Sequence, residues 1–303
     1  MENIEKVTAH IRKKVTQNGG NPNREVLTII KTIDNHTYCR DEKGNYWRGY
    51  IFIDDATSFQ VVEKPELFYN SAKAFGRFQK ILSDFPAQTL FETIPNFHNT
   101  KKRFEAFEEA VKQDVANRAN TVLPEIEFAR KRKEDASVLI DLLERGKLPL
   151  RVTHNDTKLN NVMIDNATGE GICVIDLDTV MPGLSLYDFG DSIRFGTNPA
   201  AEDEKDLSKV FVDLTLFEQF TKGFLEEAGQ SLTDTEIEYL PFSAKIMTYE
   251  CGIRFLTDYL NGDTYFKIHR EGQNLDRCRT QFKLVSDMEQ KMENMKAIVN
   301  KYK

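Results

Sequence analysis

Apolar and polar positions alternate with two different periods along the chain, and the changes of period mark out its segments. Residues 1–18 carry apolar side chains at helical spacing and end at NGGNPN, a cluster of helix-breaking residues. The stretches VLTIIKT, TYCR and NYWRGYIFID are rich in β-branched and aromatic residues, which predicts strands, with a tight turn at DEKGN. Helical spacing then predicts helices over 67–82, 101–118, 122–145, 206–228, 234–260 and 271–300.

This order of elements predicts an α+β fold with two lobes. A small N-terminal lobe, residues 1–62, would hold the first helix and a small antiparallel sheet. A large and mainly helical lobe, residues 63–303, would follow, interrupted by one β segment between residues 151 and 183. The length of 303 residues allows one large domain or two modest ones.

The β segment concentrates the polar chemistry of the chain. Its apolar runs NVMID (161–165) and ICVID (172–176) flank NATGEG, a cluster of turn-forming residues, and so predict a hairpin. If facing positions sum to about 336 or 337, Asn161 falls beside Asp176 at the open end of the hairpin. The preceding loop HNDTKLNN leaves from the same end, so Asp156 and Lys158 would join them.

These residue types suit phosphoryl transfer. An amide oxygen and a carboxylate are hard ligands for Mg²⁺, a further carboxylate can accept a proton, and a lysine can offset developing charge. The spacing of His154, Asp156, Lys158 and Asn161 is that of a kinase catalytic loop, with Asn155 where protein kinases carry arginine. The structural alternative is a polar hairpin end in which His154 is simply a buried ring.

Two further acidic positions follow the hairpin. Asp176 is the metal ligand that the register favours, and Asp178 is expected to assist or to hold a second ion. The motif Asp188-Phe189-Gly190 matches the DFG motif of protein kinases, but it lies past the hairpin. Asp188 and Asp191 are therefore expected to anchor the loop or to begin a helix.

Taken together, these motifs resemble the aminoglycoside and choline kinase family of phosphotransferases, which shares the protein-kinase fold. Within it, the segments LFETIPNFHNTKKRF, VTHNDTKLNN, VIDLDTVMPG and IRFLTDYLNGDTYFKI look like N-acetylhexosamine 1-kinases. The resemblance implies that the γ-phosphoryl group of ATP passes to the anomeric hydroxyl of N-acetylglucosamine or N-acetylgalactosamine. It also implies Mg²⁺ held by Asn161 and Asp176, with Asp156 positioning or deprotonating the hydroxyl.

The resemblance extends to the ligand-binding residues. Arg254 and Tyr265 would contact the sugar, although Arg254 could instead pair with Asp258 at i+4 and Tyr265 could be part of the core. The strand YIFID (50–54) would lead into a hinge near 50–56 that binds adenine, with Tyr50, Phe52 and Ile53 as the candidate residues.

The family carries further strands ahead of its first long helix, with a phosphate-binding loop and a lysine. This chain is expected to lack about fifty such residues, so weak or absent activity is expected for it and normal activity for a version extended upstream. A bare sheet edge would then favour a homo-oligomer that covers it. A nucleotide-binding pseudokinase is the corresponding alternative.

Charge and composition limit the classes of partner and activity that the chain can have. The net charge of −7 and pI near 5.5 argue against nucleic acid or an anionic membrane as the main partner. The four separated cysteines and the polar N-terminus favour a cytoplasmic protein without a signal peptide. A sulfatase-type hydrolase is disfavoured because no C-x-P-x-R or S-x-P-x-R segment is present. A kinase for an aminoglycoside or choline stays open as an alternative.

Overall fold

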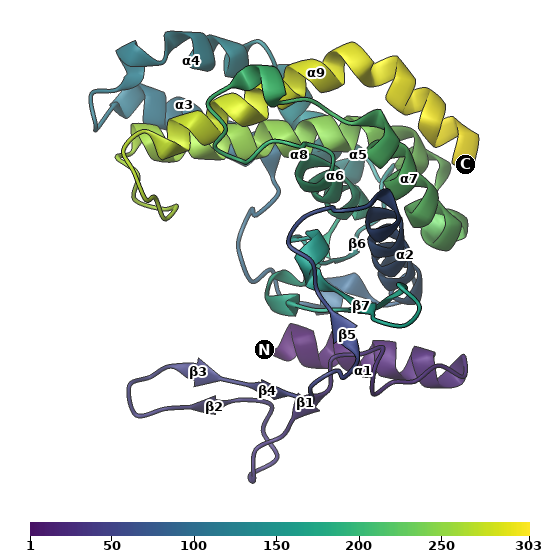
Figure 1. Ribbon diagram of the computed structural model, residues 1–303. Coiled ribbons are helices and arrows are strands. Elements are labelled where there is room, and N and C mark those ends of the chain that lie inside the picture. The colour runs from purple at the N-terminus through teal and green to yellow at the C-terminus, as the bar shows by residue number, and fades with distance from the viewer. The chain divides into compact units, whose positions relative to one another are not determined.

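The computed structural model describes residues 1–303 and is mainly helical, with short antiparallel strands, which confirms the predicted α+β class. The α-helices are α1 (Glu2–Gln17), α2 (Pro65–Ile81), α3 (Thr100–Gln113), α4 (Leu123–Arg130), α5 (Val138–Glu144), α6 (Ser185–Gly196), α7 (Leu214–Ala228), α8 (Asp234–Leu260) and α9 (Gln273–Tyr302) (Figure 1). The strands are β1 (Ile29–Ile30), β2 (Cys39–Arg40), β3 (Tyr46–Trp47), β4 (Gly49–Tyr50), β5 (Ala56–Thr57), β6 (Arg151–Thr153), β7 (Val162–Asp165), β8 (Gly171–Val174) and β9 (Met181–Gly183).

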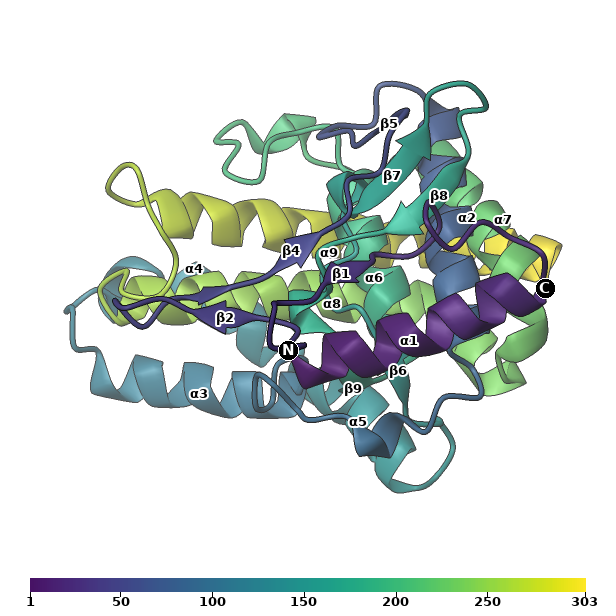
Figure 2. The ribbon, with the colours of Figure 1, turned by 90° about the horizontal axis from the view of Figure 1, so that it is seen from below.

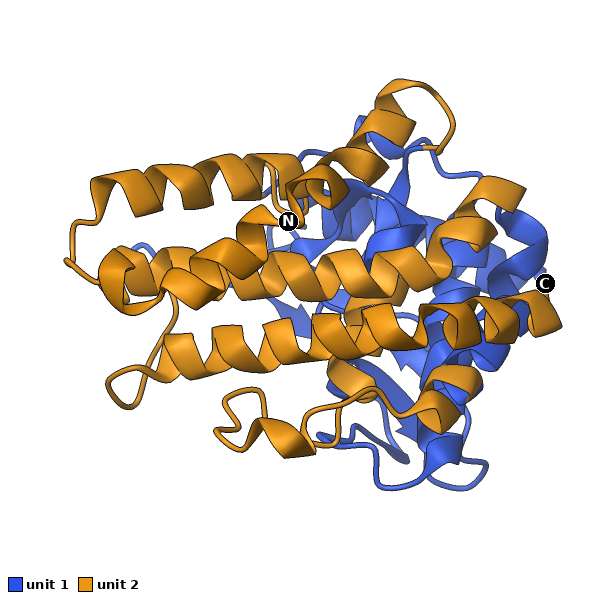
Figure 3. Ribbon diagram, turned by 90° about the horizontal axis from the view of Figure 1, so that it is seen from above, with its two compact units in different colours: residues 1–93, 150–188, 219–232 blue, residues 94–149, 189–218, 233–303 orange.

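The chain forms two compact units that interleave along the sequence. Unit 1 comprises residues 1–93, 150–188 and 219–232, and unit 2 comprises residues 94–149, 189–218 and 233–303 (Figure 3). These units do not correspond to the two lobes predicted from the sequence, residues 1–62 and 63–303. That lobe boundary remains a prediction.

The core of unit 1 is built on α1. Its buried apolar residues Ile4, Val7, Ile11 and Val15 recur at the spacing of one helix face, as the sequence pattern predicts. They pack in one cluster with buried residues of α2 and of the β7–β8 hairpin, including Phe78. Burial of each such side chain contributes roughly 1.5–3 kcal/mol, so α1 is an integral part of this unit.

The strands before α2 are shorter than the sequence predicts. Each pairing covers only two residues per strand: β1 pairs with β4, and β2 with β3, within the predicted strands VLTIIKT, TYCR and NYWRGYIFID. The turn at 41–45 is present, since the Gly44 and Asn45 amides donate to Asp41. The β2–β3 hairpin reaches away from the rest of unit 1 in both views (Figures 1 and 2). With Tyr46 and Trp47 exposed, the ladder has no packed face that would extend it.

Several helix predictions also need correction. The segment 101–118 ends early because Asp114 adopts a left-handed backbone conformation (φ 41°). The segment 122–145 is broken into α4 and α5 by a 3₁₀ turn at Lys133–Ser137. The segment 206–228 forms only a 3₁₀ turn at Leu207–Lys209 before the α-helix begins at Leu214. By contrast, the predicted helix 234–260 matches α8 in both bounds, and its start carries a capping box between Thr233 and Glu236.

In unit 2, α8 packs along α9 and against α3. The buried residues of α8 are spread around the helix rather than along one stripe, which is expected for a helix covered on several sides. None of the helices is long and apolar enough to cross a membrane.

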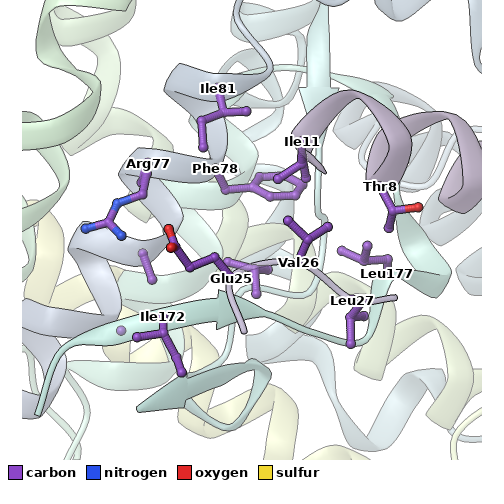
Figure 4. A pocket seen from close by; sticks show the side chains of 13 residues that line it. Thr8, Ile11, Glu25, Val26, Leu27, Arg77, Phe78, Ile81, Ile172 and Leu177 are labelled. Carbon is purple, nitrogen blue, oxygen red and sulfur yellow. The ribbon is translucent and has the colours of Figure 1, made fainter. Parts of the chain in front are cut away.

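A small cavity lies in unit 1 between α1, α2 and β8 (Figure 4). Its lining is mostly apolar, including Ile11, Val26 and Phe78, with Glu25 and Arg77 also present. Its volume of about 30 Å³ is far below the several hundred Å³ of ordinary ligand pockets. The cavity is therefore a packing feature and no nucleotide site.

Candidate active site

The β7–β8 hairpin has the register that the sequence predicts. Val162 faces Val174 and Met163 faces Cys173, so facing positions sum to 336 up to a shift at Ile164. Asn161 then lies opposite Ile175, one residue short of the Asp176 that was expected beside it, and its carbonyl accepts a hydrogen bond from the Ile175 amide at 2.9 Å. Asp176 follows immediately at the open end of the hairpin.

The loop before this hairpin is held at its base by a second strand pair. β6 pairs with β9, with Thr153 opposite Met181. The pair is close: a Cβ atom on Gly183 would lie 2.4 Å from Thr153 Oγ1, so only glycine fits there. The loop therefore leaves β6 from a fixed position and direction.

Asp156, Lys158 and Asn161 come together in this loop. Lys158 Nζ pairs with Asp156 Oδ1 at 2.7 Å. The Asn161 amide nitrogen donates to the Asp156 carbonyl at 2.8 Å and to its Oδ2 at 3.2 Å. The carboxylate of Asp156 is thus held on both sides while its side chain keeps 30% exposure.

His154 is a buried ring with a structural role. It is fully buried, with Phe75 and Phe78 packed edge-on against it at ring distances of 5.7 and 6.0 Å. Its Nε2 contacts the Ile175 carbonyl at 2.8 Å, and its Nδ1 accepts from the Asp156 amide at 3.2 Å. His154 thereby joins the loop to the end of the β7–β8 hairpin.

Asp188 anchors the loop, as expected, and lies in the first turn of α6, which begins at Ser185; Asp191 lies further along α6, where it pairs with Arg194. Its carboxylate accepts hydrogen bonds from the backbone amides of His154 and Asn155 and from the Gln79 side chain. Its own carbonyl accepts from Thr157 Oγ1 at 2.6 Å. Burial raises the pKa of Asp188, and these N–H donors oppose the rise. The whole of α6 was missed by the helix periodicity.

Asp176 and Asp178 lie beyond the hairpin end, and both are exposed. Asp176 has a left-handed backbone conformation (φ 58°), which ends the strand alternation at that residue. Asp178 Oδ1 forms an ion pair with Arg48 Nη2. The sequence reasoning did not find Arg48, because its partner is 130 residues away.

The predicted adenine-binding residues lie at the end of β4 and directly after it. Tyr50 ends that strand, and its hydroxyl is buried without a hydrogen-bond partner. The Phe52 side chain is 78% exposed, whereas that of Ile53 belongs to the core of unit 1. Only backbone atoms of Ile53 therefore remain for a ligand.

Arg254 and Tyr265 belong to unit 2. Asp258 does not pair with Arg254: its oxygens accept from the backbone amides of Thr264, Tyr265 and Phe266 and from Asn274. The alternative of an i+4 salt bridge is therefore wrong. Tyr265 is 69% exposed, so it is not a core residue.

Arg254 instead lies among aromatic side chains and beside a second arginine. Its guanidinium carbon is 5.2 Å from the Phe97 ring centroid and 5.5 Å from that of Phe266. Arg103 Nε and Nη2 both donate to the Phe97 carbonyl. Burial and the neighbouring Arg254 charge lower the pKa of Arg103.

The carboxylate that interacts with this arginine pair belongs to Glu250, and it already has other hydrogen-bond partners. Glu250 is buried and bonds to His98 Nδ1 at 2.7 Å and to Thr100 Oγ1 at 2.6 Å. Burial alone would raise the pKa of Glu250, but His98, Arg254 and Thr100 outweigh it and lower that pKa. One carboxylate thus faces two guanidinium groups, which leaves the cluster with excess positive charge.

The family of the chain is shown by its sequence. The profile of the phosphotransferase enzyme family APH matches residues 28–209, which is more than half of the chain. The chain therefore belongs to this phosphotransferase family.

Solved structures with a similar fold agree with that family. An aminoglycoside phosphotransferase from Alicyclobacillus acidocaldarius gives a TM-score of 0.61 at 14% identity, covering 97% of this chain and 83% of that one. A choline/ethanolamine kinase family protein from Mesorhizobium loti gives 0.56 at 15% identity, covering 98% and 82%. A spectinomycin phosphotransferase, solved with ADP and spectinomycin, gives 0.52 at 13% identity, covering 94% and 82%. These likenesses confirm the predicted protein-kinase-like fold of this family.

Proposed function

We propose that the chain is an ATP-dependent kinase that phosphorylates the anomeric hydroxyl of N-acetylglucosamine or N-acetylgalactosamine. The observation that carries phosphoryl transfer is the carboxylate of Asp156, held between Lys158 and Asn161. The choice of an N-acetylhexosamine rests on the sequence segments that resemble such kinases and on the positive cluster at Arg254. The use of ATP follows from the family and from neighbours solved with ADP or AMP.

Asp156 would act as the proton acceptor. The anomeric oxygen forms its bond to the γ-phosphorus while the bond from that phosphorus to the β–γ bridging oxygen breaks, and the hydroxyl proton passes to Asp156. ADP leaves with the bridging oxygen. Lys158, already paired with Asp156 Oδ1, keeps the carboxylate oriented and adds positive charge beside the transferred group.

The residues at the hairpin end fit a magnesium ion. The side-chain nitrogen of Asn161 donates hydrogen bonds to Asp156, so the side-chain oxygen is the atom that could bind the metal. Asp176 offers an exposed carboxylate, and Asp178 a second one that is now paired with Arg48. No cluster of three or more His, Cys, Asp or Glu side chains forms a protein-only metal site, which suits an ion that takes one or two protein ligands plus phosphates. When bound, Mg²⁺ would neutralise charge on the phosphates.

The resemblance assigns Arg254 to the acceptor, and the arginine cluster around it favours an acceptor without positive charge. Choline and aminoglycosides carry ammonium groups, which Arg103 and Arg254 would repel. An acetamido sugar instead presents a carbonyl oxygen that a guanidinium group can donate to, and apolar ring faces that suit Phe97 and Phe266. This argues for the sugar and against a kinase of choline or aminoglycosides.

A substrate panel with Mg-ATP tests the proposal. Both N-acetylhexosamines, glucose, galactose, choline and kanamycin would be assayed for ADP release, with phosphorus NMR to identify the product. We expect an N-acetylhexosamine to be the preferred acceptor, with turnover above that of every other compound in the panel even where the absolute rate is low, and a sugar 1-phosphate product. Turnover with kanamycin or choline alone would contradict the sugar assignment. Nucleotide binding without turnover of any acceptor would favour the pseudokinase.

Removal of either arginine should weaken the discrimination by charge. We expect N-acetylglucosamine to exceed glucosamine in kcat/KM by at least about tenfold, and Arg103→Gln or Arg254→Gln to reduce that ratio several-fold. Arg130→Gln, in the same unit and paired with Glu108, is the matched control and should leave the ratio unchanged. An unchanged ratio in both site variants would show that the cluster does not select the acceptor.

A further inference from the structure

Arg48 is positioned beside the two carboxylates that follow the hairpin. It lies between β3 and β4, and its Nη2 pairs with Asp178 Oδ1. Its guanidinium carbon is 5.5 Å from the Tyr50 ring centroid, and its Nη1 lies 3.5 Å from Met1 Sδ. The Arg48 side chain is 20% exposed, so this cation is mostly enclosed by unit 1.

Tyr50 beside it carries a hydroxyl that lacks an acceptor. The hydroxyl oxygen is buried and makes no hydrogen bond of normal geometry, although the Arg48 guanidinium group lies close enough to donate toward it. Burial raises the pKa of Tyr50, Arg48 lowers it, and Asp178 and Asp176 raise it, so all three charges act on this hydroxyl. A guanidinium group has donors only, and therefore Arg48 cannot accept the phenolic hydrogen. A buried donor left in this way is unfavourable unless a ligand or water satisfies it.

The Arg48–Asp178 ion pair is easily exchanged. The Asp178 side chain is 56% exposed, and ion pairs with such solvent access contribute little to stability. A phosphate group would accept hydrogen bonds from both Arg48 and the Tyr50 hydroxyl. Arginine in particular binds phosphate through its planar set of donors.

We propose that Arg48 and Tyr50 bind the polyphosphate of the nucleotide, with Arg48 exchanging Asp178 for a phosphate oxygen. The inference rests on the proposed function and names two residues that position its nucleotide; it assigns Tyr50 to the phosphates in place of the adenine contact that the resemblance implies. It gives the chain a phosphate-binding cation from β3–β4. The exchange also releases the Asp178 carboxylate as ADP or ATP binds.

Metal-free binding measurements test this directly. Calorimetry with ADP, AMP and adenosine in EDTA would compare the unaltered chain with Arg48→Ala. We expect at least a tenfold loss of ADP affinity, a smaller loss for AMP and none for adenosine, because only the phosphate contacts are removed. Tyr50→Phe, which keeps the ring, should lose a few-fold for ADP alone.

Two more variants sharpen the result. Arg40→Ala removes an arginine of the neighbouring β2–β3 hairpin, whose guanidinium carbon lies 5.5 Å from the Tyr46 ring centroid, and it should leave ADP affinity unchanged. Asp178→Asn should raise ADP affinity in EDTA, because it removes the carboxylate that competes for Arg48.

The outcomes separate this inference from the proposed function. Unchanged ADP affinity in Arg48→Ala would overturn the inference alone. Equal losses for ADP and adenosine would also overturn it, since they would indicate damage to the fold. If the unaltered chain bound neither ADP nor adenosine, the proposed function would fall together with the inference.

Discussion

Asp156→Asn is expected to lower kcat/KM for the sugar by about 10²–10⁴-fold, which is a loss of roughly 3–5 kcal/mol of transition-state stabilisation. The amide cannot take the hydroxyl proton, but it has nearly the shape of the carboxylate. The backbone carbonyl of residue 156 still accepts from Asn161, so the loop should keep its conformation. Steady-state kinetics with Mg-ATP and the acceptor measures the loss, and calorimetric ADP affinity should change by less than about threefold.

The control for this variant is Asp84→Asn. Asp84 is an exposed carboxylate of unit 1 that pairs with Lys14 and His10, so its substitution removes the same charge away from the candidate site. It should leave kcat/KM within about twofold of the unaltered chain. If Asp156→Asn retained more than a third of the turnover, the proton-acceptor role proposed for Asp156 would be wrong.

The parts of the site that the sequence predicts are those set by local pairing. The apolar runs at 161–165 and 172–176 specify the hairpin, and their register follows because a shift of one residue would expose the buried face. The loop spacing then brings Asp156 next to Asn161. Helix 234–260 is equally local, since its capping box and continuous apolar content define both ends.

The parts that the sequence does not predict depend on partners far along the chain. Arg48 meets Asp178 across 130 residues, and Gln79 reaches Asp188 across 109. Nothing in the stretch around either residue distinguishes it from an ordinary surface or helix position. The lengths of the strands before α2 are predicted wrongly for a related reason. Strand propensity reflects packing on a half-buried surface, and Tyr46 and Trp47 are exposed and lack such a surface.

Asp188→Asn is expected to lower the free energy of unfolding by about 3 kcal/mol and to reduce kcat strongly. The Asp188 carboxylate accepts hydrogen bonds from His154, Asn155 and Gln79. In the variant, the NH₂ group of the amide would face one or more of these N–H donors, and those hydrogen bonds would be lost. The loop that carries Asp156 would lose its anchor, while Arg48 and Tyr50, which we propose bind the nucleotide, make no contact with Asp188 and would keep their positions. Urea denaturation measures the stability, and steady-state kinetics separates kcat from KM.

Asp258→Asn provides a matched comparison, because Asp258 anchors a loop in the same way in unit 2. It is buried, and it accepts from the backbone amides of Thr264, Tyr265 and Phe266. Both variants should lose similar stability, but the Asp258 variant should raise KM for the acceptor because it releases Tyr265. The Asp188 variant should lower kcat with little change in ADP affinity. If both variants showed the same combination of lower kcat and higher KM, general destabilisation, and not the position of each loop, would explain the effect.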